Sequence, residues 1–151
     1  MFTASDLAEM EAIKLLKARY FRNLDTQNWA EWRKVFTDDV EILVDHTVTT
    51  PTQKGEGPPL PRGADAFVAH ISQFLTGAVT VHHGHMPEIT LTGPDTATGV
   101  WAMEDMVRIP GHPDMHGYGH YHDDYRKGAD GEWRIARHHL TRLRVDRGND
   151  A

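Results

Sequence analysis

The segment "TVHHGHMPEITLTGPDTATGVWAMEDMV", residues 80–107, decides the fold class. Its two halves, residues 80–91 and 96–107, are rich in β-branched residues, which are typical of strands. The residues between them include Gly93, Pro94 and Asp95, a combination typical of a tight turn. The segment therefore predicts a β-hairpin of two long antiparallel strands.

The flanking sequence extends this hairpin into an α+β domain. Apolar residues recur at helical spacing up to about Asp25, and the opposite face of this helix carries Glu11, Lys14, Lys17 and Arg22. The segments "WAEWRKVF" and "GADAFVAHISQFLTG" predict two shorter helices. One strand, "VEILVDH", precedes the third helix, and "YGHYHDDYRK" and "WRIARHHLTRLRV" predict two strands after the hairpin. Helices followed by hairpin-connected strands indicate helices packed on one face of a mostly antiparallel sheet. We expect one domain over residues 1–151, with the Pro- and Gly-rich residues 49–63 as a long loop.

Composition excludes several classes of protein. The net charge of −6 argues against nucleic-acid and anionic-membrane binding, which both need a basic surface. The chain has no cysteine, so disulfides, thiolate metal sites and a cysteine nucleophile are excluded. No apolar run approaches the roughly 20 residues of a membrane span, and no signal peptide is recognisable. We therefore expect a cytoplasmic protein whose partners are small molecules and copies of itself.

Strand alternation divides the polar residues of the hairpin between two faces. We expect His82 to point inward and His83 outward, with a bulge near Gly84 and Pro87, while the direction of His85 stays open. In the next strand, Asp105 shares a face with Trp101 and Met103. Asp105 is therefore the expected cavity carboxylate, and an edge or interface charge is an equally good interpretation. The same reasoning places Tyr121 in the cavity, whereas a surface position remains the simplest interpretation of the histidines.

Three segments carry a resemblance to a known family. "LKARYFRNLDTQNWAEWRKVFTDDVEI", the 80–107 hairpin and "GYGHYHDDYRKGADGEWRIARHHLTRLRV" resemble the SnoaL-like branch of the nuclear transport factor 2-like superfamily. The resemblance implies a single SnoaL-like domain folded as a cone-shaped α+β barrel, with three N-terminal helices on a curved sheet. This superfamily includes dehydratases, isomerases, cyclases and non-enzymatic binders, so the fold alone does not fix the reaction.

Within this branch, the sequence is similar to scytalone dehydratase and bile-acid 7α-dehydratase. The resemblance implies Tyr20, Asp25 and His82 as catalytic residues, and His116 as a second acid or base, for which Tyr118 and His120 are alternatives. Without it, Tyr20 reads as a core aromatic and Asp25 as the polar end of a helix. Independently of the resemblance, we expect Asp105, Tyr121, Trp101 and His85 to be substrate-binding residues.

This set predicts cofactor-independent chemistry on a small cyclic hydrophobic substrate. A histidine paired with a carboxylate can take an acidic proton beside a carbonyl, and a phenol can stabilise the enolate. Transfer of that proton to a leaving hydroxyl is dehydration, and its return to carbon is isomerisation. We therefore expect a lyase or isomerase with no metal and no cofactor.

Two other functions stay open. His82, His85, His116, His120, Glu104 and Asp105 could supply a histidine-based metal site, although no fixed-spacing metal motif is present. A non-catalytic module that binds a small ligand or self-associates is equally compatible with the fold. In either case we expect a homo-oligomer, dimer or trimer.

Overall fold

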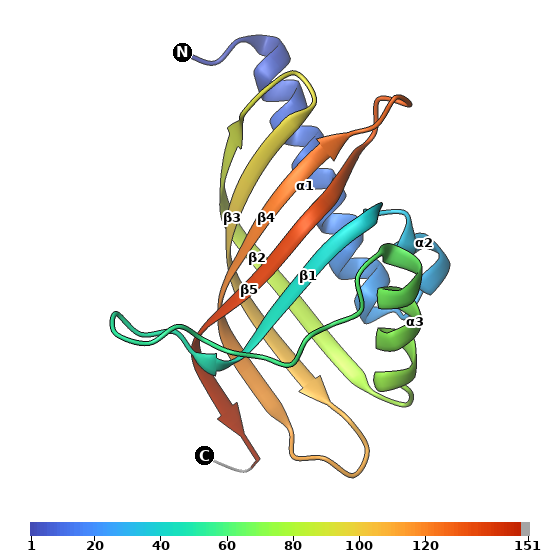
Figure 1. Cartoon of the computed structure of the whole chain (residues 1–151), viewed down its shortest axis with the longest axis vertical. Helices are drawn as coiled ribbons and strands as arrows, with labels where there is room; N and C mark the ends of the chain where they lie inside the picture. The colour runs from blue at the N-terminus through green and yellow to red at the C-terminus, as the bar shows by residue number, and fades with distance from the viewer. Residues whose placement is uncertain (149–151) are drawn as a thin grey trace.

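The computed structural model describes residues 1–148 and shows three helices lying on one side of a curved five-stranded sheet (Figure 1). The expected α+β class and helix-first order are confirmed. The elements, in chain order, are α1 (Ala4–Asp25), α2 (Trp29–Arg33), β1 (Phe36–Val48), α3 (Ala64–Phe74), β2 (Val79–Leu91), β3 (Thr96–Arg108), β4 (Met115–Lys127) and β5 (Trp133–Arg147).

Helix α1 begins with a capping box. The Thr3 side chain accepts a hydrogen bond from the Asp6 backbone N–H, and the Asp6 carboxylate accepts one from the Thr3 N–H. These two bonds satisfy donors that the first turn of any helix leaves free. One face of α1 is buried against the sheet and the other helices, and its ending at Asp25 puts that carboxylate beside β2. The cap and the apolar face thus fix the position of a candidate site residue.

The strand order in the sheet is β1-β5-β4-β3-β2. Strands β2 to β5 form an antiparallel meander, and β1 joins β5 in parallel. The sheet is strongly curved but not closed, because β1 and β2 remain at its two edges. Its concave face carries the buried residues of each strand and meets the helices, as the resemblance implied for a cone.

Edge strand β2 contains the expected bulge. Pairing with β3 is regular from Val79 to His85, breaks, and resumes at Glu88, and Met86 adopts φ 40° at the break. The bulge follows His85, so His83 and His85 keep the normal alternation and share the outer face.

The segment of residues 49–63 has no regular secondary structure but lies against β1. The backbone N–H groups of His46 and Thr47 both donate to the Glu56 carbonyl. A Cβ at Gly57 would lie 1.8 Å from the Val44 carbonyl oxygen, so only glycine allows this approach. The contact carries Pro58 and Leu60 to the cavity described below.

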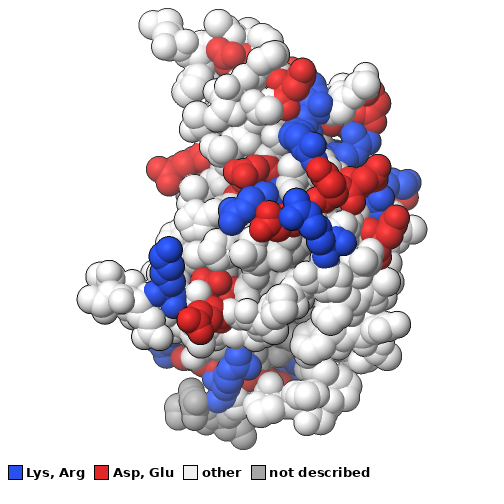
Figure 2. Space-filling view, in the orientation of Figure 1, with Lys and Arg blue, Asp and Glu red and all other residues white. Residues whose placement is uncertain are grey.

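Charged side chains of both signs are interspersed on the face shown in Figure 2. The ion pairs of the structure include Arg126 with Asp39 and Arg33 with Asp65. No helix of residues 1–148 is long and apolar enough to cross a membrane.

Candidate active site

A cavity of about 370 Å³ lies between the helices and the concave face of the sheet. This volume falls within the roughly 300–1,000 Å³ of typical small-molecule pockets. Its walls are mainly apolar, and they include Leu24, Trp32, Phe67, Ile71, Leu75, Val107 and Leu140. A few polar side chains reach the same space from different elements. The cavity therefore suits an apolar molecule that carries a small number of polar groups.

The first polar group is a histidine held by a carboxylate. His82 Nδ1 lies 2.6 Å from Asp25 Oδ1, while the His82 backbone N–H donates to Asp25 Oδ2 over 2.8 Å. The Thr80 hydroxyl also donates to Asp25 Oδ1. Both carboxylate oxygens are thus committed, and the His82 ring lines the cavity in front of them. With Nδ1–H donating to Asp25, Nε2 carries the lone pair that can accept a proton.

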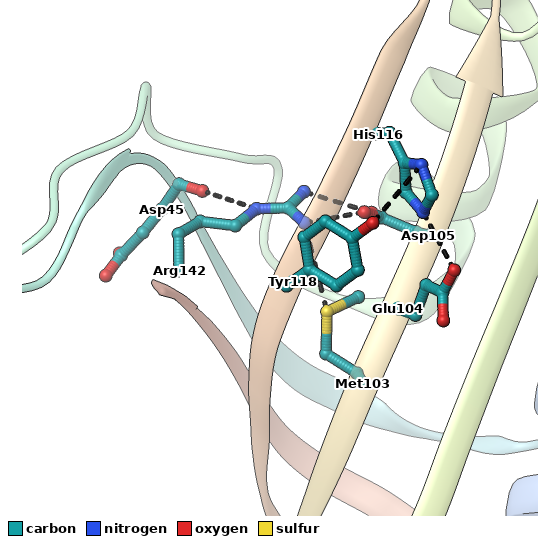
Figure 3. A network of polar contacts seen from close by, with 7 residues as sticks. All are labelled: Asp45, Met103, Glu104, Asp105, His116, Tyr118 and Arg142. Carbon is teal, nitrogen blue, oxygen red and sulfur yellow. Dashed lines mark hydrogen bonds and ion pairs between the residues drawn. The ribbon is translucent and has the colours of Figure 1, made fainter. Parts of the chain in front are cut away.

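The second polar group is a buried ion pair on the neighbouring strands. Asp105 is the cross-strand partner of His82, and both side chains line the cavity. Arg142 on β5 binds both oxygens of Asp105, at 2.7 and 3.0 Å, and its Nε–H donates to the Asp45 carbonyl (Figure 3). Each side chain of the pair is only 4% exposed. The positive charge of Arg142 therefore balances the negative charge of Asp105. The two hydrogen bonds also fix the orientation of the planar guanidinium group of Arg142.

Two phenols add to the polar lining. Burial, reinforced by nearby carboxylates such as Asp123, raises the pKa of Tyr20 well above its ordinary range. Burial likewise raises the pKa of Tyr121, whose hydroxyl has no hydrogen-bond partner within residues 1–148. Both phenols therefore stay protonated at neutral pH. Tyr121 lines the cavity, and a buried hydroxyl without a partner is a feature that calls for an explanation in a folded protein.

A charged network behind the cavity was not predicted. Lys17 Nζ lies 2.6 Å from Asp123 Oδ2, and His138 Nδ1 lies 2.6 Å from Asp123 Oδ1. Lys17 is completely buried and lies over the Tyr121 ring, although helical spacing had placed it on the polar face of α1. Burial alone would raise the pKa of Asp123, but Lys17 and His138 hold it well below its ordinary range. The alternation of Tyr121 and Asp123 signalled an inward carboxylate, but nothing local signalled its partner.

Sequence comparison assigns the family. A family model described as "SnoaL-like domain" matches residues 5–139. The chain belongs to the SnoaL-like domain family. Several solved structures share the fold of this SnoaL-like chain. A provisionally assigned scytalone dehydratase from Novosphingobium aromaticivorans DSM 12444 is 24% identical, with a TM-score of 0.76, covering 96% of this chain and 91% of that one.

Two further structures show the same likeness. A protein of unknown function from Mycobacterium tuberculosis is 25% identical, with a TM-score of 0.73, over 91% of this chain and 73% of that one. A hexachlorocyclohexane dehydrochlorinase from Novosphingobium barchaimii LL02 is 16% identical, with a TM-score of 0.77, over 96% of this chain and 93% of that one. At such identities the likeness shows a common fold and leaves the reaction open.

At this cavity the structure brings together five of the eight predicted site residues. Tyr20, His82, Asp105 and Tyr121 all line it, and Asp25 contacts His82 from behind. Polar side chains that the sequence did not single out also line it: His46, His70, His112, His138 and Arg142. For Arg142 and His138, the alternation of β5 with buried Leu140 was the available signal.

Three predicted residues lie elsewhere. His116 points away from the cavity and pairs with Glu104, because it stands opposite outward-facing Met106 in the β3–β4 register. His85 is exposed on the outer face of β2. Trp101 is buried on the inner face, but its indole N–H donates to the Tyr125 hydroxyl and its ring packs near Gly84 outside the cavity. Their expected roles in binding and catalysis do not fit these positions.

Proposed function

We propose that this SnoaL-like protein is a cofactor-independent lyase or isomerase acting on a small cyclic hydrophobic substrate with a carbonyl group. The observation that carries the proposal is the 2.6 Å contact between His82 Nδ1 and Asp25 Oδ1 at the wall of an apolar cavity. A carboxylate that fixes the tautomer of an imidazole and stabilises its cation makes that imidazole a general base.

In the proposed step, His82 Nε2 takes a proton from the carbon next to the substrate carbonyl. The electron pair of the broken C–H bond moves toward the carbonyl oxygen and forms an enolate. The Tyr121 hydroxyl is the proposed hydrogen-bond donor to that oxygen, because it has no partner within the described chain. Tyr20 is a second candidate donor, because its ring lies against that of Tyr121, with centroids 6.2 Å apart.

The protonated His82 can then transfer its proton in two ways. If the substrate carries a hydroxyl on the β carbon, the enolate pair expels it and His82 returns the proton, so that water leaves. If the substrate instead carries a β,γ carbon–carbon double bond, His82 returns the proton to the γ carbon, and the double bond moves into conjugation with the carbonyl. We assign Asp105 and Arg142 a role in orienting polar substituents of the substrate, because Asp105 is the cross-strand neighbour of His82 and binds Arg142. The net reaction is dehydration in the first case and isomerisation in the second.

The experiment is a panel of cyclic β-hydroxy ketones and β,γ-unsaturated ketones, assayed with wild type and His82→Ala. We expect turnover by wild type and a loss of roughly 10²–10⁴-fold in kcat for His82→Ala. His120→Ala, on the outer face of β4, is the matched histidine control and should keep full activity. Equal turnover by wild type and His82→Ala would overturn the proposal, and tight binding with no turnover would favour a non-catalytic binding module instead.

Self-association belongs to the same proposal and has its own measurement. We expect sedimentation of the purified protein to give a dimer or trimer, because small domains of this shape commonly form closed symmetric assemblies. A monomer at high concentration would contradict this expectation and leave the catalytic proposal untouched.

A further inference from the structure

The outer face of β2 and β3 carries a cluster of metal-ligating side chains that faces away from the cavity. His83 and His85 are two residues apart on β2, and Glu104 on β3 is the cross-strand partner of His83. Strand alternation therefore puts all three side chains on the same face. One ligand atom from each lies within 4.8 Å of the other two.

The carboxylate of this cluster is already oriented by its neighbours. His116 Nε2 lies 2.8 Å from Glu104 Oε1, and the His116 ring stacks on Tyr118 with centroids 4.6 Å apart (Figure 3). Figure 3 also shows Glu104 turned toward His116 while adjacent Asp105 turns toward Arg142. Oε2 of Glu104 is not used in this contact. Metal sites commonly contain such an outer partner that holds a ligating carboxylate.

We propose that His83, His85 and Glu104 bind one divalent first-row transition-metal ion, with Zn²⁺ the reference ion. Two neutral imidazoles and one carboxylate suit such ions, whereas Mg²⁺ and Ca²⁺ require oxygen ligands. Three protein ligands leave a fourth tetrahedral position for water. Metal–ligand bonds of about 2.0–2.1 Å place tetrahedral ligand atoms roughly 3.3 Å apart, so the side chains must close by about 1.5 Å at most. His83 and His85 are exposed, and rotation about their side-chain bonds allows this closure.

The site joins the edge strand β2 to β3 next to the break in pairing after His85. A metal ion there links two strands at the point where backbone pairing is interrupted. His82 lies on the same stretch of β2 and lines the cavity, whereas His83, His85 and Glu104 do not. Asp25 and His82 also border a shallow surface pocket beside His83 and His85. We assign the metal a structural role, in which it holds the edge strand β2 to β3.

The test is isothermal titration of tag-free, EDTA-treated protein with ZnCl₂, followed by a thermal melt. We expect one zinc per chain and a rise in Tm of roughly 5–10 °C at a free zinc concentration 100 times Kd. The His83→Gln/His85→Gln variant lacks two of the three ligands and should weaken binding at least 100-fold, which removes most of the rise in Tm at the same zinc concentration. His116→Ala should weaken binding roughly 10–100-fold through loss of carboxylate orientation. Mg²⁺ and Ca²⁺ should produce neither heat nor a shift in Tm.

The control variant is His120→Gln/His122→Gln, which removes another outward pair two residues apart, on β4. The centroids of its two rings lie 6.3 Å apart, close to the 6.0 Å of His83 and His85, but within residues 1–148 no carboxylate completes a three-ligand group there. This variant should bind zinc like wild type. Unchanged binding by His83→Gln/His85→Gln with a wild-type circular-dichroism spectrum would overturn the proposal. One zinc per two chains with dimer formation on titration would also overturn it, because the ligands would then come from two copies.

Discussion

Glu104 and Asp105 are adjacent in β3, yet their carboxylates lie on opposite sides of the sheet and bind different partners. Asp105 accepts two hydrogen bonds from buried Arg142, whereas Glu104 contacts half-exposed His116. Strand alternation places the two carboxylates on opposite faces of the sheet, and the helices bury the face that carries Asp105. A buried pair and an exposed pair therefore occupy neighbouring positions with very different energetic consequences.

The buried pair should be strongly coupled. Asp105→Leu leaves Arg142 charged and unpaired inside the cavity wall, and we expect it to lower the free energy of unfolding by about 3–5 kcal/mol. Arg142→Leu should cost a similar amount, whereas the double variant should lie much closer to wild type. Urea unfolding of the four proteins measures the coupling. Strictly additive losses would contradict it. Asp114→Ala, in the exposed pair with Arg108, is the control and should change stability little.

Asp25 is expected to act through His82 as a positioning residue. Asp25→Asn keeps an oxygen near His82 Nδ1 but removes the charge that stabilises the imidazolium, so kcat should fall about 10²-fold or more with KM nearly unchanged. Asp25→Glu should recover part of the rate. Thr80→Val removes only one hydrogen bond to Asp25 and should cost less than about tenfold. A uniform rise in KM with kcat intact would show that Asp25 acts on binding.

Stability should decrease in mild acid because of His138. Burial lowers the pKa of His138 below its ordinary 6.5, against the opposing effect of Asp123 and with a further lowering by Lys17. Between the folded pKa and 6.5, the unfolded chain binds a proton that the folded chain does not. The free energy of unfolding therefore falls as the pH drops below 6.5, by up to about 1.4 kcal/mol per pH unit for this group.

Thermal melts at pH 7.5 and 5.5 measure this effect. His138→Asn keeps a donor for Asp123 but does not titrate, so its loss of Tm between the two pH values should be smaller than that of wild type. Part of the loss should remain, since burial also lowers the pKa of His46 and His122. His112→Asn, at an exposed position, should behave like wild type. Asp123 contributes in the same direction but only below about pH 4, outside this window.

The 49–63 segment should control access to the cavity. In Gly57→Ala the new methyl group collides with the Val44 carbonyl, so the segment must move off β1 and take Pro58 and Leu60 with it. We expect faster dissociation of an apolar fluorescent ligand, by roughly tenfold, with Tm lowered by only a few degrees. Lys54→Ala, an exposed change in the same segment, should leave dissociation unaltered. Equal dissociation rates for Gly57→Ala and wild type would show that the 49–63 segment does not control access to the cavity.

Periodicity determined much of this protein. Alternation within β2, β3 and β4 is a local consequence of strand geometry, so it placed His82, Asp105 and Tyr121 on one surface and His83 on the other. The helix-then-hairpin order fixed the α+β class. The Asp25–His82 contact came from the family resemblance, because no local pattern relates a helix end to a strand 57 residues away.

Only the tertiary structure decided the remaining partners. Helical spacing put Lys17 on the polar face of α1, but the curvature of the sheet wraps β4 over that position and supplies Asp123, 106 residues away. His116 was expected in the cavity, and the β3–β4 register turns it outward to Glu104. Register and curvature arise from contacts between strands and helices far apart in sequence. The periodicity of the sequence predicts which residues share a face of a strand or helix. The tertiary structure determines which residues that face contacts.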